Sequence, residues 1–294
     1  MRRSVLTIPA FAKLNLSLDV LGLRPDGYHD IRSVVQTVSL ADELSFAPAD
    51  CLVVESPISP PEQDLVWRAA RLLQQAAHVA HGAHITVRKE IPVGAGLGGG
   101  SADAAATLVG LNELWDLDRD RTELMDIGGQ LGSDVPFLIQ GGTALLEGRG
   151  ERVTALSGVG TAFFVVLWPK FSLATDQVYR HAIAGSGQRS RTLLAQLSTK
   201  RWQLAGNDLT TAAVAVAPEL GRWVSELSAR TGKEPQLTGS GSALFWLADS
   251  EPDARRLAEK VPDDAFVRVV QTVEEKPWNR ANARADRGRD PGGH

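Results

Sequence analysis

Residues 92–102 read Pro-Val-Gly-Ala-Gly-Leu-Gly-Gly-Gly-Ser-Ala, and Asp103 follows them. A strand pattern precedes this glycine-rich run, and an alanine-rich helical pattern from about Ser101 to Trp115 follows it. Glycines let backbone N–H groups approach an anion closely, and a helix that starts behind them adds the positive end of its dipole. We therefore predict a phosphate-binding loop formed by Pro92, Val93, Gly94, Ala95, Gly96, Leu97, Gly98, Gly99, Gly100, Ser101 and Ala102.

Other glycine-rich loops have a similar composition. The first alternative is a flexible surface loop, but the run lies between a strand and a helix, which favours phosphate binding. A dinucleotide-binding fold also contains Gly-x-Gly-x-x-Gly, here Gly94, Gly96 and Gly99, but it needs a strand soon after the helix. In this sequence the helix leads through residues 116–118 into a second helical pattern, which disfavours that fold. No Gly-Lys-Ser/Thr closes the loop, so it is not a Walker motif.

The rest of the chain alternates between strand and helix patterns. Strands are predicted at 12–20, 34–40, 44–46, 85–91, 143–147, 162–168, 243–248 and 265–271. Further helices are predicted at 64–77 (capped by Asp64), 121–131, 176–184, 207–215, 218–230 and 252–260. We place a domain boundary near Val153, which gives domains 1–153 and 154–275. Residues 276–294 lack apolar periodicity and are predicted to be a disordered tail.

Bulk composition narrows the class of protein. Of the 294 residues, 43% are hydrophobic and 22% charged, as in a soluble globular protein. The net charge of -4 argues against nucleic-acid binding, because nucleic-acid-binding domains usually carry a basic surplus. No apolar run approaches the roughly 20 residues that span a bilayer, and no signal peptide is recognisable. Cys51 is the only cysteine, which fits a reducing cytoplasm.

Several polar residues have two interpretations from the sequence alone. Lys13 and Asn15 share one face of an alternating strand, and this face is either solvated or functional. Asp134 lies between Ser133 and an apolar run, where it is either a helix cap or turn residue, or a catalytic carboxylate. The run Gly239-Ser240-Gly241-Ser242 is either a tight turn or a ligand contact. Both interpretations stay open in each case.

Three histidines could suggest a metal site. His78, His81 and His84 are spaced by three, but Gly82 intervenes and His84 stands at the entry to a strand. The three are not expected to share one face, so we predict no metal-ligating residues here.

The motifs taken together resemble the GHMP kinase superfamily, over roughly residues 7–273. Within it, the resemblance is to kinases that act on a cytidine-diphosphate-linked sugar alcohol. The stretches that carry the resemblance, in chain order, are Ala12–Leu16, Asp26–His29, Pro92–Ala106, Gly132–Phe137, Gly206–Leu209 and Thr238–Ser242. The superfamily implies an α+β, two-domain fold. Its N-terminal domain would resemble ribosomal protein S5 and its C-terminal domain a ferredoxin, with the active site in the cleft between them.

The resemblance also implies roles for individual residues. Asp134 matches the catalytic base, and Lys13 matches the lysine that pairs with it and neutralises the transferring phosphoryl group. The glycine loop would wrap the ATP phosphates, with Ser101 near the phosphates and Mg²⁺. Leu65 and Val66 match the adenine pocket. The acceptor-binding positions are matched by Asn15, Tyr28, His29, Thr175 and Tyr179, with Tyr28, His29 and Tyr179 in the cytosine pocket.

The implied reaction is ATP-dependent phosphorylation of the 2-hydroxyl of 4-diphosphocytidyl-2-C-methyl-D-erythritol, a step towards isoprenoid precursors. ATP and Mg²⁺ are the implied cofactors, and the partners are expected to be small molecules, with no nucleic acid and no membrane. The protein is expected to be a monomer or a weak homodimer. A homoserine or mevalonate kinase of the same superfamily is the first alternative, although the Asp26–His29 stretch argues against it. A non-catalytic nucleotide-binding module is the second.

Overall fold

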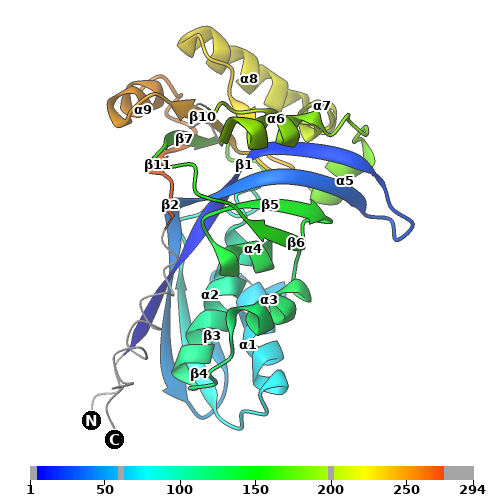
Figure 1. The fold of residues 1–294 in the computed structure, drawn as a ribbon. Helices are drawn as coiled ribbons and strands as arrows, with labels where there is room; N and C mark the ends of the chain where they lie inside the picture. Colours follow the sequence, from blue (N-terminus) through cyan, green and yellow to red (C-terminus); the bar gives the residue numbers. More distant parts are fainter. Residues whose placement is uncertain (1–4, 59–62, 198–201, 275–294) are drawn as a thin grey trace, which may run out of the picture.

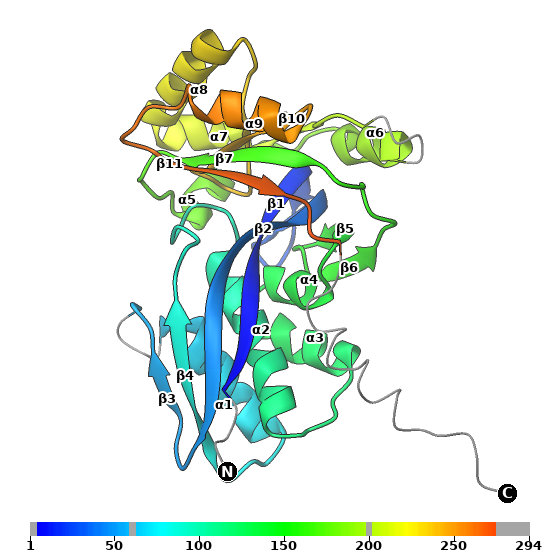
Figure 2. The ribbon, with the colours of Figure 1, turned by 90° about the vertical axis from the view of Figure 1, so that its left-hand side faces the viewer.

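The computed structural model describes residues 5–58, 63–197 and 202–274. Figures 1 and 2 show two β-sheets, each with its own layer of helices, joined by two long strands that run through the molecule. The predicted tail, residues 276–294, lies outside these ranges. Among the described residues, no helix has the length and apolar character needed to cross a membrane.

A seven-stranded sheet forms most of the N-terminal half. Its main path is β3-β4-β2-β1-β8. Strand β5 pairs with the first part of β2, from Ile31 to Gln36, and β6 pairs with β5. The antiparallel pairing of β1 and β2 runs from Leu6 opposite Phe46 to Leu23 opposite His29. The strands are β1 (Leu6–Leu23), β2 (His29–Ala49), β3 (Val53–Glu55), β4 (Gly82–Arg88), β5 (Thr143–Gly148), β6 (Arg152–Ala155) and β8 (Gly206–Asn207).

Helix α2 is the centre of the N-terminal core. It packs on β1 and β2 and is flanked by the other three helices of this half. Small side chains allow this close approach: a Cβ at Gly110 would lie 2.5 Å from the ring of Phe46, so only glycine fits there. The helices of this half are α1 (Leu65–Ala76), α2 (Gly99–Leu114), α3 (Arg121–Gly129) and α4 (Asp134–Gln140).

A four-stranded antiparallel sheet, ordered β11-β7-β10-β9, forms the C-terminal half. Helices α7 to α9 lie on the side of this sheet that faces away from the N-terminal half (Figure 2). The strands are β7 (Phe163–Trp168), β9 (Gln236–Leu237), β10 (Leu244–Ala248) and β11 (Phe266–Gln271). The helices are α5 (Thr175–Arg180), α6 (Gln188–Leu197), α7 (Leu209–Val216), α8 (Pro218–Thr231) and α9 (Glu251–Ala258).

Strand β1 belongs to both halves. Its middle covers the N-terminal core, whereas Leu18 and Val20 are buried in the core of the C-terminal half. Strand β8 pairs with it in parallel, with Ser17 opposite Gly206. The pairing of β1 with β2 has one register shift just before Lys13 and another just after Asn15. Such bulges re-aim side chains, and here they occur where β1 passes between the two halves.

Most predicted elements are confirmed, with differences that have local causes. The strands predicted at 34–40 and 44–46 form one strand, β2, because its pairing with β1 continues through residues 41–43, and the carboxylate of Asp42 accepts the backbone N–H groups of Glu90 and Ile91. The strand predicted at 85–91 instead ends at Arg88, and the helix predicted at 176–184 ends at Arg180. Asp64 caps α1 as predicted, accepting the N–H of Val66. Helices α4 and α6 and the short strands β3, β6, β8 and β9 were not predicted.

Candidate active site

A cleft of about 1340 Å³ lies between the two halves. Residues from β1, the glycine loop, the start of α4, helix α5 and the Gly239–Ser240 turn line it together. The predicted site residues that line it are Lys13, Asn15, Tyr28, His29, Leu65, each residue of the run 92–101, Asp134, Thr175 and Tyr179. Val66 and Ala102 do not: they are 1% and 2% exposed and are buried in the N-terminal hydrophobic core.

The glycine loop has the geometry of an anion cradle. Gly94, Gly96 and Gly98 have positive φ angles of 71°, 81° and 74°, which favour glycine. Gly98 is the N-cap of α2, and no side chain caps this helix end, so its first N–H groups remain available to a ligand. A Cβ at Gly96 would lie 2.5 Å from the carbonyl oxygen of Thr238. The loop therefore needs glycine both for its backbone shape and for its contact with the C-terminal half.

Lys13 and Asp134 meet in the cleft, beside this loop. Lys13 Nζ lies 3.6 Å from Asp134 Oδ2, and the Lys13 side chain is 6% exposed whereas that of Asp134 is 34% exposed. The backbone N–H of Lys13 donates to the carbonyl of Leu97, which ties β1 to the glycine loop. Helix α4 has Ser133 as its N-cap, so Asp134 is not the capping residue and its carboxylate faces Lys13.

Asn15 is a junction between the halves. Its Oδ1 accepts from Lys13 Nζ at 2.7 Å, from the N–H of Gly239 at 2.8 Å and from Thr238 Oγ1 at 3.2 Å. Its Nδ2 donates to Ser33 Oγ at 2.9 Å. An amide oxygen has two lone pairs, and these donors already engage them. In this structure Asn15 orients the Lys13 ammonium and the Gly239 turn.

The aromatic end of the cleft brings the predicted cytosine-pocket residues together. The rings of His29 and Tyr179 have centroids 5.4 Å apart and are tilted by 35°. Tyr28 is 56% exposed, so its ring presents a large free surface. Shielding from water, and secondly the charge of Asp134, raise the pKa of the Tyr179 phenol above its usual value.

A buried triad of ionisable side chains, Lys89, Asp42 and Asp103, was not predicted. Lys89 Nζ lies 2.5 Å from Asp42 Oδ2 and 2.5 Å from Asp103 Oδ2. Asp103 Oδ1 has no hydrogen-bond partner among the described residues. Burial raises the pKa of Asp103 to about 8, although the neighbouring Lys89 acts in the opposite direction. The only signal in the sequence is that Asp103 directly follows the glycine run.

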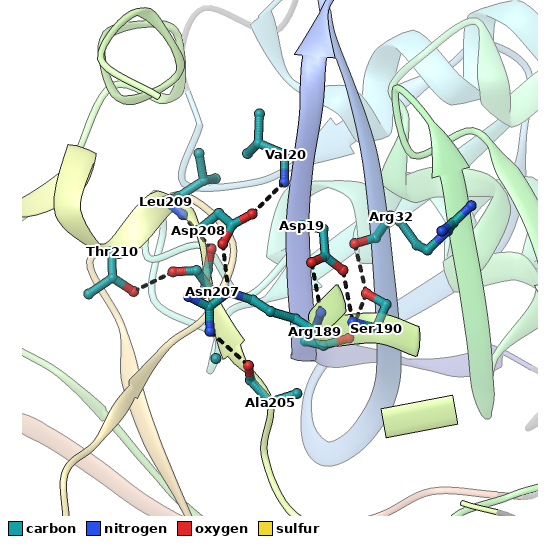
Figure 3. Close-up of polar contacts among 12 residues, drawn as sticks. Asp19, Val20, Arg32, Arg189, Ser190, Ala205, Asn207, Asp208, Leu209 and Thr210 are labelled. Atoms are coloured by element: carbon teal, nitrogen blue, oxygen red, sulfur yellow. Dashed lines mark hydrogen bonds and ion pairs between the residues drawn. The ribbon is translucent and has the colours of Figure 1, made fainter. Parts of the chain in front are cut away.

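A second network, remote from the reacting groups, supports β1 from the C-terminal half (Figure 3). Asp19 accepts the backbone N–H groups of Arg189 and Ser190, at the start of α6. Asp208 accepts the N–H of Val20 at 3.0 Å and the Nε–H of Arg189 at 2.6 Å. The polar face of β1 is thus buried by tertiary partners, and the solvated alternative does not hold for it: Asp19 is 1% exposed.

His84 and His81, two of the three closely spaced histidines, have different neighbours. His84 pairs with Glu55 across the β3–β4 edge, and His81 lies edge-on to Trp115. Within the described ranges, no group of three or more His, Cys, Asp or Glu side chains could hold a metal ion.

Comparison with known proteins identifies the family. The model of the GHMP kinases N terminal domain matches residues 64–142. The 4-diphosphocytidyl-2-C-methyl-D-erythritol kinase of Pelotomaculum thermopropionicum is 41% identical over 268 residues, which cover 87% of this chain and 93% of that protein. This chain belongs to the 4-diphosphocytidyl-2-C-methyl-D-erythritol kinase family. The predicted resemblance is therefore confirmed.

Solved structures place this family member in its fold. A crystal structure of 4-(cytidine 5'-diphospho)-2C-methyl-D-erythritol kinase matches with a TM-score of 0.81 at 34% identity, covering 91% of this chain and 99% of that one. A homoserine kinase from Cytophaga hutchinsonii matches with a TM-score of 0.71 at 15% identity, covering 94% and 97%, which shows the fold alone. The α+β, two-domain GHMP kinase fold and the class of ATP-dependent small-molecule kinase are confirmed.

Proposed function

We propose that this chain transfers the γ-phosphate of ATP to the 2-hydroxyl of 4-diphosphocytidyl-2-C-methyl-D-erythritol, giving the 2-phosphate and ADP. The observation that carries the proposal is the Lys13–Asp134 pair, 3.6 Å apart, in a cleft that also contains the glycine loop and the aromatic end. Two domains, 1–153 and 154–275, would meet at this cleft and each contribute residues to it.

The donor end is formed by the glycine loop and α2. ATP phosphates would lie against the uncapped N-terminus of α2, where backbone N–H groups and the helix dipole favour negative charge. Leu65, which contacts the cleft beside Gly100, would cover the adenine. Mg²⁺ binds oxygen and is usually held by substrate phosphates with few protein ligands. The hydroxyl of Ser101 fits that chemistry, since it lies in the first turn of α2 and lines the cleft. When bound, the metal would neutralise charge on the phosphates.

The acceptor end is formed by the aromatic residues. The cytosine would stack on Tyr179 and Tyr28, because a base and an aromatic ring present matching flat faces. The ring nitrogens of His29 would read the base edge by hydrogen bonding. Thr175 Oγ1, which bonds Ser240 Oγ at 3.0 Å, would hold this end against the Gly239–Ser240 turn.

Transfer itself needs little covalent chemistry from the protein. The transition state is loose, with charge spread over the equatorial phosphoryl oxygens, so catalysis rests on positioning and on electrostatic stabilisation. Asp134 would orient the acceptor hydroxyl and take its proton late in the reaction. Lys13, held by Asn15, would place its positive charge beside both the carboxylate and the transferring group.

Product formation with a panel of acceptors tests the proposal. The protein would be incubated with ATP, Mg²⁺ and one of 4-diphosphocytidyl-2-C-methyl-D-erythritol, homoserine or mevalonate, and ADP would be measured. We expect ADP with the cytidine-linked acceptor alone, and phosphorus NMR should place the new phosphate at the 2-position. ADP formation with homoserine or mevalonate instead would move the chain to another GHMP kinase activity. ATP binding without turnover of any acceptor would favour a non-catalytic nucleotide-binding module.

A further inference from the structure

Arg149 is a cationic side chain in the cleft that the scheme above does not use. It lies in the turn between β5 and β6, is half-buried and lines the cleft. Its guanidinium carbon is 4.9 Å from the centre of the Tyr28 ring. A guanidinium over an aromatic face is held by cation–π attraction while the N–H groups at its edge stay free to bind an anion.

The other basic side chains of the cleft already have carboxylate partners. These pairs are Lys13 with Asp134, Lys89 with Asp42 and Asp103, and Arg180 with Asp176. The guanidinium of Arg149 makes no ion pair and no side-chain hydrogen bond with any residue in the described ranges. Glu151 bonds the backbone N–H of Arg149 rather than its guanidinium, and Asp26, whose pKa Arg149 helps to lower, is itself paired with Arg24. Within the described ranges, Arg149 therefore brings into the cleft a guanidinium that has no carboxylate ion-pair partner of its own.

The turn that presents Arg149 is fixed between the two ends of the acceptor site. The backbone N–H of Arg149 donates to Glu151 Oε2 at 2.6 Å. On one side its guanidinium covers Tyr28, and on the other side a Cβ at Gly150 would lie 3.5 Å from Ser133 Cβ. Ser133 directly precedes Asp134, so Arg149 lies between the base-binding end and the carboxylate that receives the reacting hydroxyl.

In an acceptor that spans those two ends, the negatively charged diphosphate lies between the base and the reacting hydroxyl. With the cytosine at Tyr28, His29 and Tyr179 and the reacting hydroxyl at Asp134, the diphosphate bridge passes the β5–β6 turn. Planar guanidinium groups bind phosphate oxygens through paired N–H donors. Resting on the proposed function, we propose that Arg149 forms an anion subsite that binds the diphosphate of the acceptor and selects nucleoside diphosphates over uncharged nucleosides.

Binding of cytidine and CDP separates this role from simple support of Tyr28. Both ligands would be titrated by calorimetry into the full-length protein, with a non-hydrolysable ATP analogue saturating the donor site. The variants are Arg149→Ala, Arg149→Lys and the matched control Arg152→Ala, an exposed arginine on the same hairpin that does not line the cleft. Loss of a charge-assisted hydrogen bond should weaken CDP binding to Arg149→Ala by about 10- to 100-fold. Cytidine binding should change less than about twofold.

The lysine variant, the salt dependence and the control variant distinguish anion binding by Arg149 from support of Tyr28. Arg149→Lys keeps the charge but not the paired donors, so its CDP affinity should fall between those of Arg149→Ala and the parent. Added salt should weaken CDP binding less in Arg149→Ala than in the parent, and Arg152→Ala should match the parent. Equal losses for cytidine and CDP would overturn the proposal and leave Arg149 as a support for Tyr28. Unchanged CDP affinity would also overturn it. A parent protein that binds neither ligand would overturn the proposed acceptor class, and this subsite with it.

Discussion

The ammonium group of Lys13, in the middle of β1, lies 3.6 Å from the carboxylate of Asp134, at the first residue of α4. Asn15 holds this ammonium group from the other side at 2.7 Å. The backbone N–H of Lys13 also donates to the carbonyl of Leu97 in the glycine loop. We propose that two groups so close act on one transition state. Their joint removal is therefore the sharpest test of the mechanism.

Substitution of Asp134 and Lys13 should give large, non-additive losses of turnover. Asp134→Asn keeps shape but cannot take a proton, so kcat should fall by about 10²- to 10⁴-fold while ATP still binds. Lys13→Met should also lower kcat steeply, and the double variant should be barely slower than the slower single variant. Steady-state kinetics of the four proteins measures this. A fewfold loss in Asp134→Asn, or fully additive losses, would contradict the shared role.

Substitution of Gly98 should weaken ATP binding as well as destabilise the backbone. Its φ is +74° and a Cβ there would lie 3.0 Å from Lys13 Cγ, so Gly98→Ala should lower ATP affinity about tenfold or more. Gly232 is the matched control, with φ +72° and nothing within 4 Å of a Cβ, at the end of α8. Both variants should lose about 1–2 kcal/mol of stability from the left-handed conformation. Equal ATP affinity in the two variants, by calorimetry, would remove the loop from the donor site.

Tyr179 should contribute to acceptor binding through its ring. Tyr179→Ala removes a stacking partner worth about 1–3 kcal/mol, so the acceptor KM should rise about ten- to a hundredfold at constant ATP affinity. Tyr179→Phe keeps the ring and should stay near the parent. His29→Ala should in addition reduce the preference for cytosine over uracil in the acceptor. Unchanged acceptor kinetics in Tyr179→Ala and His29→Ala would rule out a cytosine pocket here.

Asp103 should make the unliganded protein less stable as pH rises. Its folded-state pKa of about 8 is above the 3.8 that is usual for an aspartate, so the native state holds a proton that the unfolded chain releases. Its contribution to stability is therefore complete below about pH 4 and is lost as pH rises towards 8. Asp103→Asn should flatten the fall in unfolding free energy between pH 5 and 8, measured in urea. The exposed Asp126→Asn should keep the parental slope, and an equal slope in Asp103→Asn would show that Asp103 is ionised throughout.

Features that depend on residues close together in the sequence could be predicted from it. The glycine run predicted its own role as a loop before a helix, because positive φ angles and close backbone approach demand glycine at particular positions. Asp64 likewise predicted the start of α1, since capping is a contact between neighbours in sequence. Helix α6 escaped prediction because its first N–H groups are satisfied by Asp19, which is distant in sequence.

The sequence by itself determined the order of most strands and helices, the position of the glycine loop before α2, and the family whose motifs single out the candidate site residues. These depend on side-chain periodicity, on glycine and on short motifs, all of which are local. Tertiary structure alone decided that Lys13 faces Asp134, that Asn15 joins two halves of the chain, and that Lys89 is buried between two carboxylates. It also decided that Arg149 enters the cleft over Tyr28. The physical reason is that β1 crosses from one core to the other, so its polar face is matched by partners that no local pattern specifies.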